Sequence, residues 1–211
     1  KDKSQVKQIH QAMLIFAESN RDRLPRPGLI NRLTDEYLGE DLPGRGKEDF
    51  EKNHTAFLHS AMIAQDFYAP DLVVGPTEVN PVVRVDQVYD YDAYKPADDI
   101  YWDGDYVSGG SNPGGRFNAE LEGGTECNVS YANMALCGER LKLKWRNTQN
   151  EGDPMIATRG TRDGDYSGDD YTTSLTLELH PPKRQWTGNV VFSDNHAETI
   201  DNFFPTATSY E

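Results

Sequence analysis

An amphipathic pattern at the start of the chain limits the possible folds more than any other feature. Between residues 4 and 20, apolar side chains recur every three or four positions, as on one face of an α-helix. These positions are Val6, Ile9, Met13, Phe16 and Ala17. Prolines at positions 25 and 27 disfavour helix in the residue before each, so the helix is expected to end there. Such a helix must bury its apolar face against another layer of the protein.

A second helix and a series of short strands are expected after this helix. Residues 48–67 again place apolar side chains on one side, and from Pro70 onward the sequence changes to short apolar runs. The predicted strands are residues 72–74, 82–85, 141–145, 174–179 and 189–192. Several alternate apolar with polar residues, which is typical of half-buried antiparallel strands. Helices followed by strands predict an α+β fold, with the opening helix packed on an antiparallel sheet.

Residues 97–124 are expected to form long loops, because they are rich in glycine, aspartate and asparagine. The chain has 211 residues, which is enough for one domain with a substantial core. We therefore predict a single globular unit, residues 1–211, with two helices, an antiparallel sheet and long Gly- and Asp-rich loops.

The charge of the chain excludes one class of partner. Its 21 Lys and Arg stand against 35 Asp and Glu, a net charge of −14 that repels phosphate backbones, so nucleic acid is not expected to bind. The sequence has no apolar run of about 18 residues, the minimum for a membrane-spanning helix. It enters a helical pattern directly at Lys1, as expected if an upstream leader or anchor had been removed.

Residues 180–198 contain the most specific pattern in the chain. An apolar run at residues 189–192 is followed by Asp194 and Asn195, which favour a tight turn, and then by a second short run that ends at Ile200. A closing β-hairpin is therefore predicted. The pattern residues are His180, Trp186, Gly188, Asn189, Asp194, Asn195 and His196.

Three segments together resemble bacterial prepilin-type proteins of the kind abundant in planctomycetes: this hairpin, residues 129–134, and the opening helix with the turn that follows it, through residue 28. In that family the C-terminal part carries a processing-associated signature in which a histidine precedes an Asp-Gly pair. Here the spacing from His180 to Asp194 is longer, and Asn195 stands in place of the glycine. Because Asn also tolerates left-handed backbone, the turn is expected to survive the exchange.

The resemblance implies a pilin-like fold and a structural role without catalysis. In such proteins an apolar N-terminal helix, absent from this sequence, packs with copies of itself inside a filament, and the globular head covers the outside. The chain is thus expected to be the head of a type IV pilus-like or type II secretion pseudopilus-like subunit. It would be extracytoplasmic, anchored to the inner membrane before assembly, with copies of itself and other pilin or secretion-system subunits as partners. Residues 35–125 match no part of the family and are expected to form an insertion that carries the specific function.

Residues 163–170 form the leading candidate for a metal site. Oxygen side chains at positions one, three and five, followed by glycine at position six, open a calcium loop. The candidate calcium ligands are Asp163, Asp165, Ser167 and Asp169. Related major pseudopilins carry a calcium ion in a loop near their C-terminal strands. The twelfth position is Ser174 instead of glutamate, so a solvated acidic turn fits the same residues. Asp103 and Asp105 form a second, smaller candidate.

Aromatic residues gather in the acidic middle of the chain. Because aromatic faces stack on sugar rings, Tyr101, Trp102 and Tyr106 are candidates for a glycan-binding surface. An exported carbohydrate- or surface-binding module is therefore the alternative to a filament subunit. The same aromatic residues would also serve to anchor long loops on the sheet.

Two cysteines, Cys127 and Cys137, are the only ones in the chain. Their spacing lacks the pairs that zinc and redox motifs need. In an exported protein they would form a disulfide, and two free buried thiols are the alternative.

Enzymatic patterns are weak. His180, His196 and Asp194 fit either a metal or general-base site or a structural role, and adjacent acids such as Asp169 and Asp170 fit a hydrolase or simply a charged loop. Asp98 and Asp99 form a second pair of this kind. His54 and His59, five residues apart, point to different faces of a helix. The nucleophile-elbow, phosphate-loop and dinucleotide glycine patterns are absent from the sequence, so no catalytic role is expected.

Overall fold

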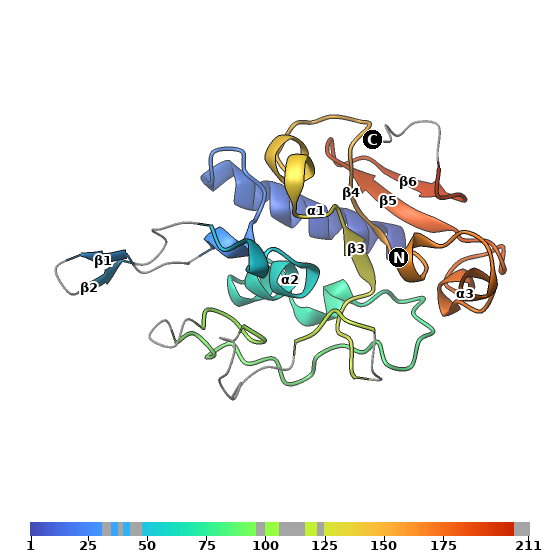
Figure 1. Ribbon diagram of the computed structural model, residues 1–211, viewed down its shortest axis with the longest axis horizontal. Helices are drawn as coiled ribbons and strands as arrows, with labels where there is room; N and C mark the ends of the chain where they lie inside the picture. Colours follow the sequence, from blue (N-terminus) through green and yellow to red (C-terminus); the bar gives the residue numbers. More distant parts are fainter. Residues whose placement is uncertain are drawn as a thin grey trace.

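The structure, a computed structural model, describes residues 1–30, 35–37, 40–42, 48–95, 100–105, 117–121 and 125–204. In this part the chain has the predicted α+β fold (Figure 1). A long N-terminal helix, α1, crosses a four-stranded antiparallel sheet, and a second helix, α2, packs with the middle loops against the same core.

Helix α1 (Asp2–Ser19) confirms the helix predicted for residues 4–20. All five apolar positions of the predicted face are buried in the main core. The side chain of Asn20 donates a hydrogen bond to the Phe16 carbonyl (2.7 Å) just beyond the last turn. Arg21 and Asp22 then take left-handed backbone, with φ of 58° and 59°. The chain therefore turns back before it reaches the two prolines.

The sheet contains β3 (Tyr131–Asn133), β4 (Pro154–Thr158), β5 (Gly188–Phe192) and β6 (Ala197–Ile200), in that spatial order. Each strand runs antiparallel to its neighbours, and β5 and β6 form the predicted closing hairpin. Every residue of β5 is buried, because α1 packs against this strand and a second cluster packs around its alternate side chains. The second cluster contains Leu177, Trp186, Val190, Phe192 and Ile200.

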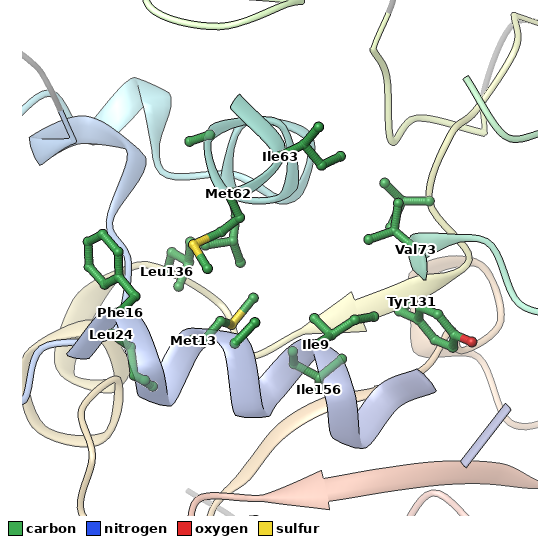
Figure 2. Packing of buried hydrophobic residues seen from close by; sticks show 14 of the residues in the cluster. Ile9, Met13, Phe16, Leu24, Met62, Ile63, Val73, Tyr131, Leu136 and Ile156 are labelled. Carbon is green, nitrogen blue, oxygen red and sulfur yellow. The ribbon is translucent and has the colours of Figure 1, made fainter. Parts of the chain in front are cut away.

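Helix α2 (Thr55–Ala64) lies within the second predicted helix, residues 48–67, but is shorter. A 3₁₀ turn, η2 (Phe50–Lys52), precedes it. Side chains from α1, α2 and the sheet meet in one cluster, as Figure 2 shows for Met13, Met62 and Ile156. The middle loops add further members to the same cluster: Tyr89, Tyr101, Trp102 and Phe117. The helices, the sheet and the middle loops thus share one core.

The other described elements are short. Strands β1 (Asp35–Tyr37) and β2 (Glu40–Leu42) pair as a separate antiparallel ribbon. A 3₁₀ turn, η1 (Pro27–Leu29), follows the end of α1. Around residues 163–170, the candidate calcium segment, the 3₁₀ turn η7 (Arg162–Gly164) precedes α3 (Asp169–Thr172), a single helical turn.

Four of the five predicted strands are wrong. Residues 72–74 fall at the 3₁₀ turn η3 (Pro70–Val73), and residues 174–179 fall at the 3₁₀ turn η8 (Leu175–Glu178). Residues 141–145 fall at a π-helical turn, η6 (Arg140–Lys144). Residues 82–85 contribute an isolated bridge, between Val83 and Cys127, in place of a strand. Strand β4, in turn, was not predicted.

The reason for these errors is clearest at residues 141–145. Leu141 and Trp145 are buried, whereas Leu143 between them is 64 % exposed. Apolar residues four positions apart fit one side of a helical turn as well as they fit a strand, and a run this short does not separate the two periods. Strand β4 was missed because Met155 and Ile156 are both buried, which removes the alternation that marks a half-buried strand.

Burial of His59 on α2 makes the stability of the fold depend on pH. Its Nδ1 lies 2.9 Å from the Tyr68 hydroxyl, and burial lowers its pKa from the ordinary 6.5 to about 3. The unfolded chain therefore takes up a proton near its ordinary pKa that the folded protein does not take up. This contribution to stability is complete above that pKa and is lost as the pH falls toward the folded value.

We predict that this one residue lowers the free energy of unfolding by about 2 kcal/mol between about pH 7 and pH 5. His59→Gln keeps a polar side chain but does not titrate, so its stability should fall less over the same interval. Urea unfolding of both proteins at the two pH values measures the difference. Equal decreases in the two proteins would contradict the assignment.

Candidate functional site

A buried carboxylate on the first turn of α1 organises the main polar cluster of the structure. Asp2 is 6 % exposed. Its carboxylate accepts hydrogen bonds from the Tyr131 hydroxyl (2.7 Å) and the Asn189 amide (2.7 Å). The Thr158 hydroxyl donates a longer bond to it (3.4 Å), and Nε2 of His180 lies 3.2 Å away. We call these five residues the Asp2 clamp.

The sheet brings the partners of Asp2 together. Tyr131 of β3 lies directly opposite Thr158 of β4 in the antiparallel register. The Asn189 backbone N–H of β5 donates to the Thr158 hydroxyl (3.0 Å), which joins the third strand to the other two. His180 enters from the segment between η8 and β5. One carboxylate on α1 therefore binds side chains from three adjacent strands.

The electrostatics of the clamp favour a fixed arrangement of donors. Burial, together with the nearby Asp2 carboxylate, raises the pKa of Tyr131, so its hydroxyl stays protonated and donates. The carboxylate also sits at the N-terminal end of α1, where the helix dipole favours negative charge. A protonated His180 imidazole would complete an ion pair with it.

A second set of polar contacts holds the closing hairpin to the middle of α1. Asn195 occupies the predicted turn with a left-handed φ of 65°. Its side-chain oxygen lies 3.1 Å from Nδ1 of His10, and its amide donates to the Gln11 side chain (2.6 Å). His10 is fully buried, and burial lowers its pKa. The neutral ring must therefore donate from Nδ1 to the Asn195 oxygen.

The other signature residues shape the hairpin itself. The indole N–H of Trp186 donates to the Arg159 carbonyl (3.0 Å), and its ring stacks on Phe203 with centroids 4.7 Å apart. A Cβ at Gly188 would lie 2.4 Å from the Trp186 ring, so only glycine fits there. The His196 ring stacks on Phe192 and bonds the Asp194 carboxylate (2.5 Å).

A buried ion pair fastens the middle of the chain to the sheet. Arg159, at the end of β4, binds Glu78 with both guanidinium nitrogens, one of them at 2.8 Å. Burial acts to raise the pKa of Glu78, but the hydrogen bonds and charge of Arg159, with those from Asn80 and Ser130, bring it below its ordinary value. Ser130, beside β3, donates to the same carboxylate (2.9 Å).

The structure leaves the proposed calcium ligands spread along an exposed segment. Asp163, Asp165, Ser167 and Asp169 are all exposed. Asp163 lies in η7, and Asp169 begins α3. Within the described ranges, no three His, Cys, Asp or Glu side chains are grouped to hold a metal ion. Calcium binding here stays a prediction that would require the segment to rearrange.

Two of the three aromatic candidates are core residues, so they do not form the predicted glycan-binding surface. Tyr101 is 4 % and Trp102 2 % exposed, and Tyr106 lies outside the described residues. Next to them, Lys52 pairs with Asp105 (2.9 Å) and lies 5.2 Å from the Tyr101 ring centre. The two rings thus anchor the loop on the core, the other role that the sequence offered for them.

The smaller acidic candidate and the middle histidines also have structural positions. The Asp103 carboxylate accepts a hydrogen bond from the Asp90 backbone N–H (3.2 Å), and the Asp105 carboxylate forms the buried ion pair with Lys52. Neither carboxylate therefore faces an open site. His54 occupies the N-cap position of α2, and its ring lies tilted against Phe57 with centroids 3.9 Å apart. Asp98 and Asp99 lie outside the described residues.

The predicted disulfide is not formed in this structure. Both cysteines are free thiols: Cys127 is buried and Cys137 is exposed. The Cys127 thiol donates to the Val129 carbonyl (3.4 Å), and burial raises its pKa.

Comparison with protein-family models, curated proteins and solved structures gives no match for this chain. No helix in the described part of the chain is both long enough and apolar enough to cross a membrane.

Sequence reasoning identified one side of the helix–sheet contact and missed the other. His180, Asn189 and Asn195 were named as signature residues, and the structure places all three against α1. Asp2 and Thr158 were not singled out. An acid placed four residues before the first apolar position of the helix, at Val6, was the available signal for Asp2.

We predict that Asp2→Ala lowers the free energy of unfolding by about 2–4 kcal/mol, because it leaves several buried donors without their acceptor. Ser4→Ala, on the exposed side of the same turn, is the matched control and should change it by less than about 0.5 kcal/mol. Denaturant unfolding at neutral pH measures both variants. A loss for Asp2→Ala no larger than that of the control would show that the clamp does not stabilise the fold.

The free thiols give a direct chemical prediction. In the native protein a thiol reagent should modify Cys137 and leave Cys127 unmodified until the chain unfolds, because reaction needs an accessible thiolate. Intact-mass spectrometry before and after denaturation measures this. A protein purified without reductant that is lighter by two hydrogens, and unreactive even when unfolded, would instead contain the disulfide.

Proposed function

We propose that this chain is the water-facing head of a non-catalytic filament subunit, in a type IV pilus-like or type II secretion pseudopilus-like assembly. The observation that carries the proposal is the role of the closing signature. Its residues His180, Asn189 and Asn195 bind the opening helix at two separate places. The opening helix and the closing hairpin are two of the three parts of the chain that resemble prepilin-type proteins, and the fold joins them.

Polar contacts of this kind between α1 and the sheet suit a subunit in which mechanical force acts on the helix. Apolar packing alone is non-directional and allows sliding, whereas satisfied buried polar bonds define one arrangement. The Asp2 clamp sets the axial position of the first turn, and Asn195 sets that of the third. Force applied to the N-terminal end of α1 would therefore be transmitted to the sheet through directional hydrogen bonds.

The exposed side of α1 is available to neighbouring subunits under this proposal. It is polar along most of its length and contains one large apolar residue, Ile15, which is 50 % exposed. Mixed surfaces of this type are common where subunits touch over limited areas.

Burial of the clamp favours a structural role over acid–base catalysis. Asp2, His180 and Tyr131 include the residue types of a general acid and base, but a catalytic group must reach its substrate. The side chains of Asp2 and His180 are only 6 % and 13 % exposed. Their polar atoms already bind one another, which supports the non-catalytic reading.

The location and partners belong to the same proposal. The head would face the extracytoplasmic side, anchored in the inner membrane before assembly and surrounded by copies of itself and other subunits afterwards. A net charge of −14 is compatible with a soluble surface that does not bind nucleic acid.

We predict that in the natural gene a short leader and an apolar segment of about 20 residues precede Lys1. Expressed from that gene, the full-length protein should sediment with membranes and appear in sheared filament fractions, whereas residues 1–211 alone should remain in the supernatant. Immunoblotting of the fractions measures this. A cytosolic start codon without an apolar segment, or identical fractionation of the two forms, would contradict the proposal.

A further inference from the structure

Positive charge in this acidic protein is concentrated in two segments. Residues 20–26 and 139–147 together contain seven basic and two acidic residues, a net charge of +5. The rest of the chain contains 14 basic and 33 acidic residues, a net charge of −19. The molecule is therefore strongly polarised despite its overall negative charge.

The fold places these two segments side by side at the C-terminal end of α1. Arg23 and Arg146 form an antiparallel backbone bridge. The Trp145 indole donates to the Pro25 carbonyl (2.8 Å), and a guanidinium nitrogen of Arg26 donates to the Leu141 carbonyl (2.8 Å). The two segments thus form one surface.

Four arginines of this surface form no ion pair within the part of the chain that the structure describes. They are Arg21, Arg23, Arg140 and Arg146, which we call the basic end. All four are exposed, and none forms an ion pair with any residue that the structure describes. The three other cations of the two segments are occupied: Arg26 by Glu48, Lys142 by Glu139, and Lys144 by Asp153.

The same surface contains a cavity. Arg21, Arg23 and Arg26 line a cavity of about 550 Å³, together with Phe16, Leu29 and Gln65. Leu143, on the adjoining η6 turn, is 64 % exposed. An arginine-rimmed hollow with apolar contacts is the composition that protein interfaces favour, since arginine is enriched in them and lysine is depleted.

We infer that the basic end is a docking surface for a second copy of this chain, whose acidic surface supplies the missing carboxylates. This inference rests on the proposed function and names the contact between heads. Guanidinium groups are planar and bind carboxylates with two parallel hydrogen bonds. Another copy is the partner that fits, because the rest of its chain has a net charge of −19, which complements the basic end.

The position of the basic end favours a head-to-tail contact. Helix α1 has 18 residues and is therefore about 27 Å long. The segment around α3, at the end of the molecule where α1 begins, carries the exposed Asp163, Asp165, Asp169 and Asp170 (Figure 1). A contact between unlike ends does not close on itself unless its rotation forms a ring, so it repeats along an open filament.

The experiment uses residues 1–211 and two charge-reversed variants. The first carries Arg23→Glu and Arg146→Glu at the basic end, and the second carries Asp165→Lys and Asp170→Lys at the acidic end. Sedimentation velocity at low ionic strength is run near the effective concentration, on the order of 1 mM, that a shared filament provides. We expect the unsubstituted protein to associate reversibly and each variant alone to associate at least tenfold more weakly. An equimolar mixture of the two variants should recover association, because each then meets an opposite charge.

The control carries Lys7→Glu and Arg84→Glu, two exposed reversals outside both the basic end and residues 163–170, and should associate like the unsubstituted protein. Association should also weaken as salt rises, because exposed charge pairs are screened. Unchanged association of the Arg23/Arg146 variant, or variants that do not recover it when mixed, would overturn the inference. Either result would leave the proposed function open, since that is decided by the segment upstream of Lys1.

Discussion

The contact between the buried face of α1 and the four-stranded sheet is what the rest of the structure depends on. Val6, Ile9, Met13 and Phe16 lie in the main core, and burying an apolar side chain contributes about 1.5–3 kcal/mol. Four such residues contribute about 6–12 kcal/mol, which is comparable to the whole net stability of a typical domain. The sheet and α2 would therefore not keep a stable core if the helix were removed. Figure 2 shows side chains of α1, α2 and the sheet meeting in this core.

Polar contacts fix the position of α1 on the sheet within this apolar interface. The Asp2 clamp joins the first turn of α1 to three strands, and Asn195 joins the hairpin turn to the middle of the helix. Farther from the helix, the Glu78–Arg159 and Lys52–Asp105 pairs hold the middle segment to the same core. Buried charges of this kind are costly unless paired, and each is paired here. They specify one arrangement of parts that apolar packing alone would leave less well defined.

The fold was predictable from the sequence where the apolar pattern was long or the turn chemistry was specific. Seventeen residues of helical repeat fixed α1, and Asp194 with Asn195 fixed the closing hairpin. Short runs failed, because η3, η6 and η8 each bury only one or two side chains, too few to separate a helical turn from a strand. The candidate site was predictable only in part. His180 and Asn189 were identified as signature residues, but their common partner Asp2 was not, because it lies 187 positions from Asn189. A pairing that distant leaves no local pattern. The burial of Tyr101 and Trp102 was equally invisible, because aromatic residues in an acidic loop suit a surface and a core anchor alike.

We expect α1 and the sheet to unfold as one unit. Native-state hydrogen exchange, read residue by residue, tests it most directly, because local opening and global unfolding give different free energies. Amides from Val6 to Ala17 should exchange with the same free energy of opening, and the same denaturant dependence, as those of β5. Exchange of the α1 amides at a markedly lower free energy, while β5 stays protected, would contradict it.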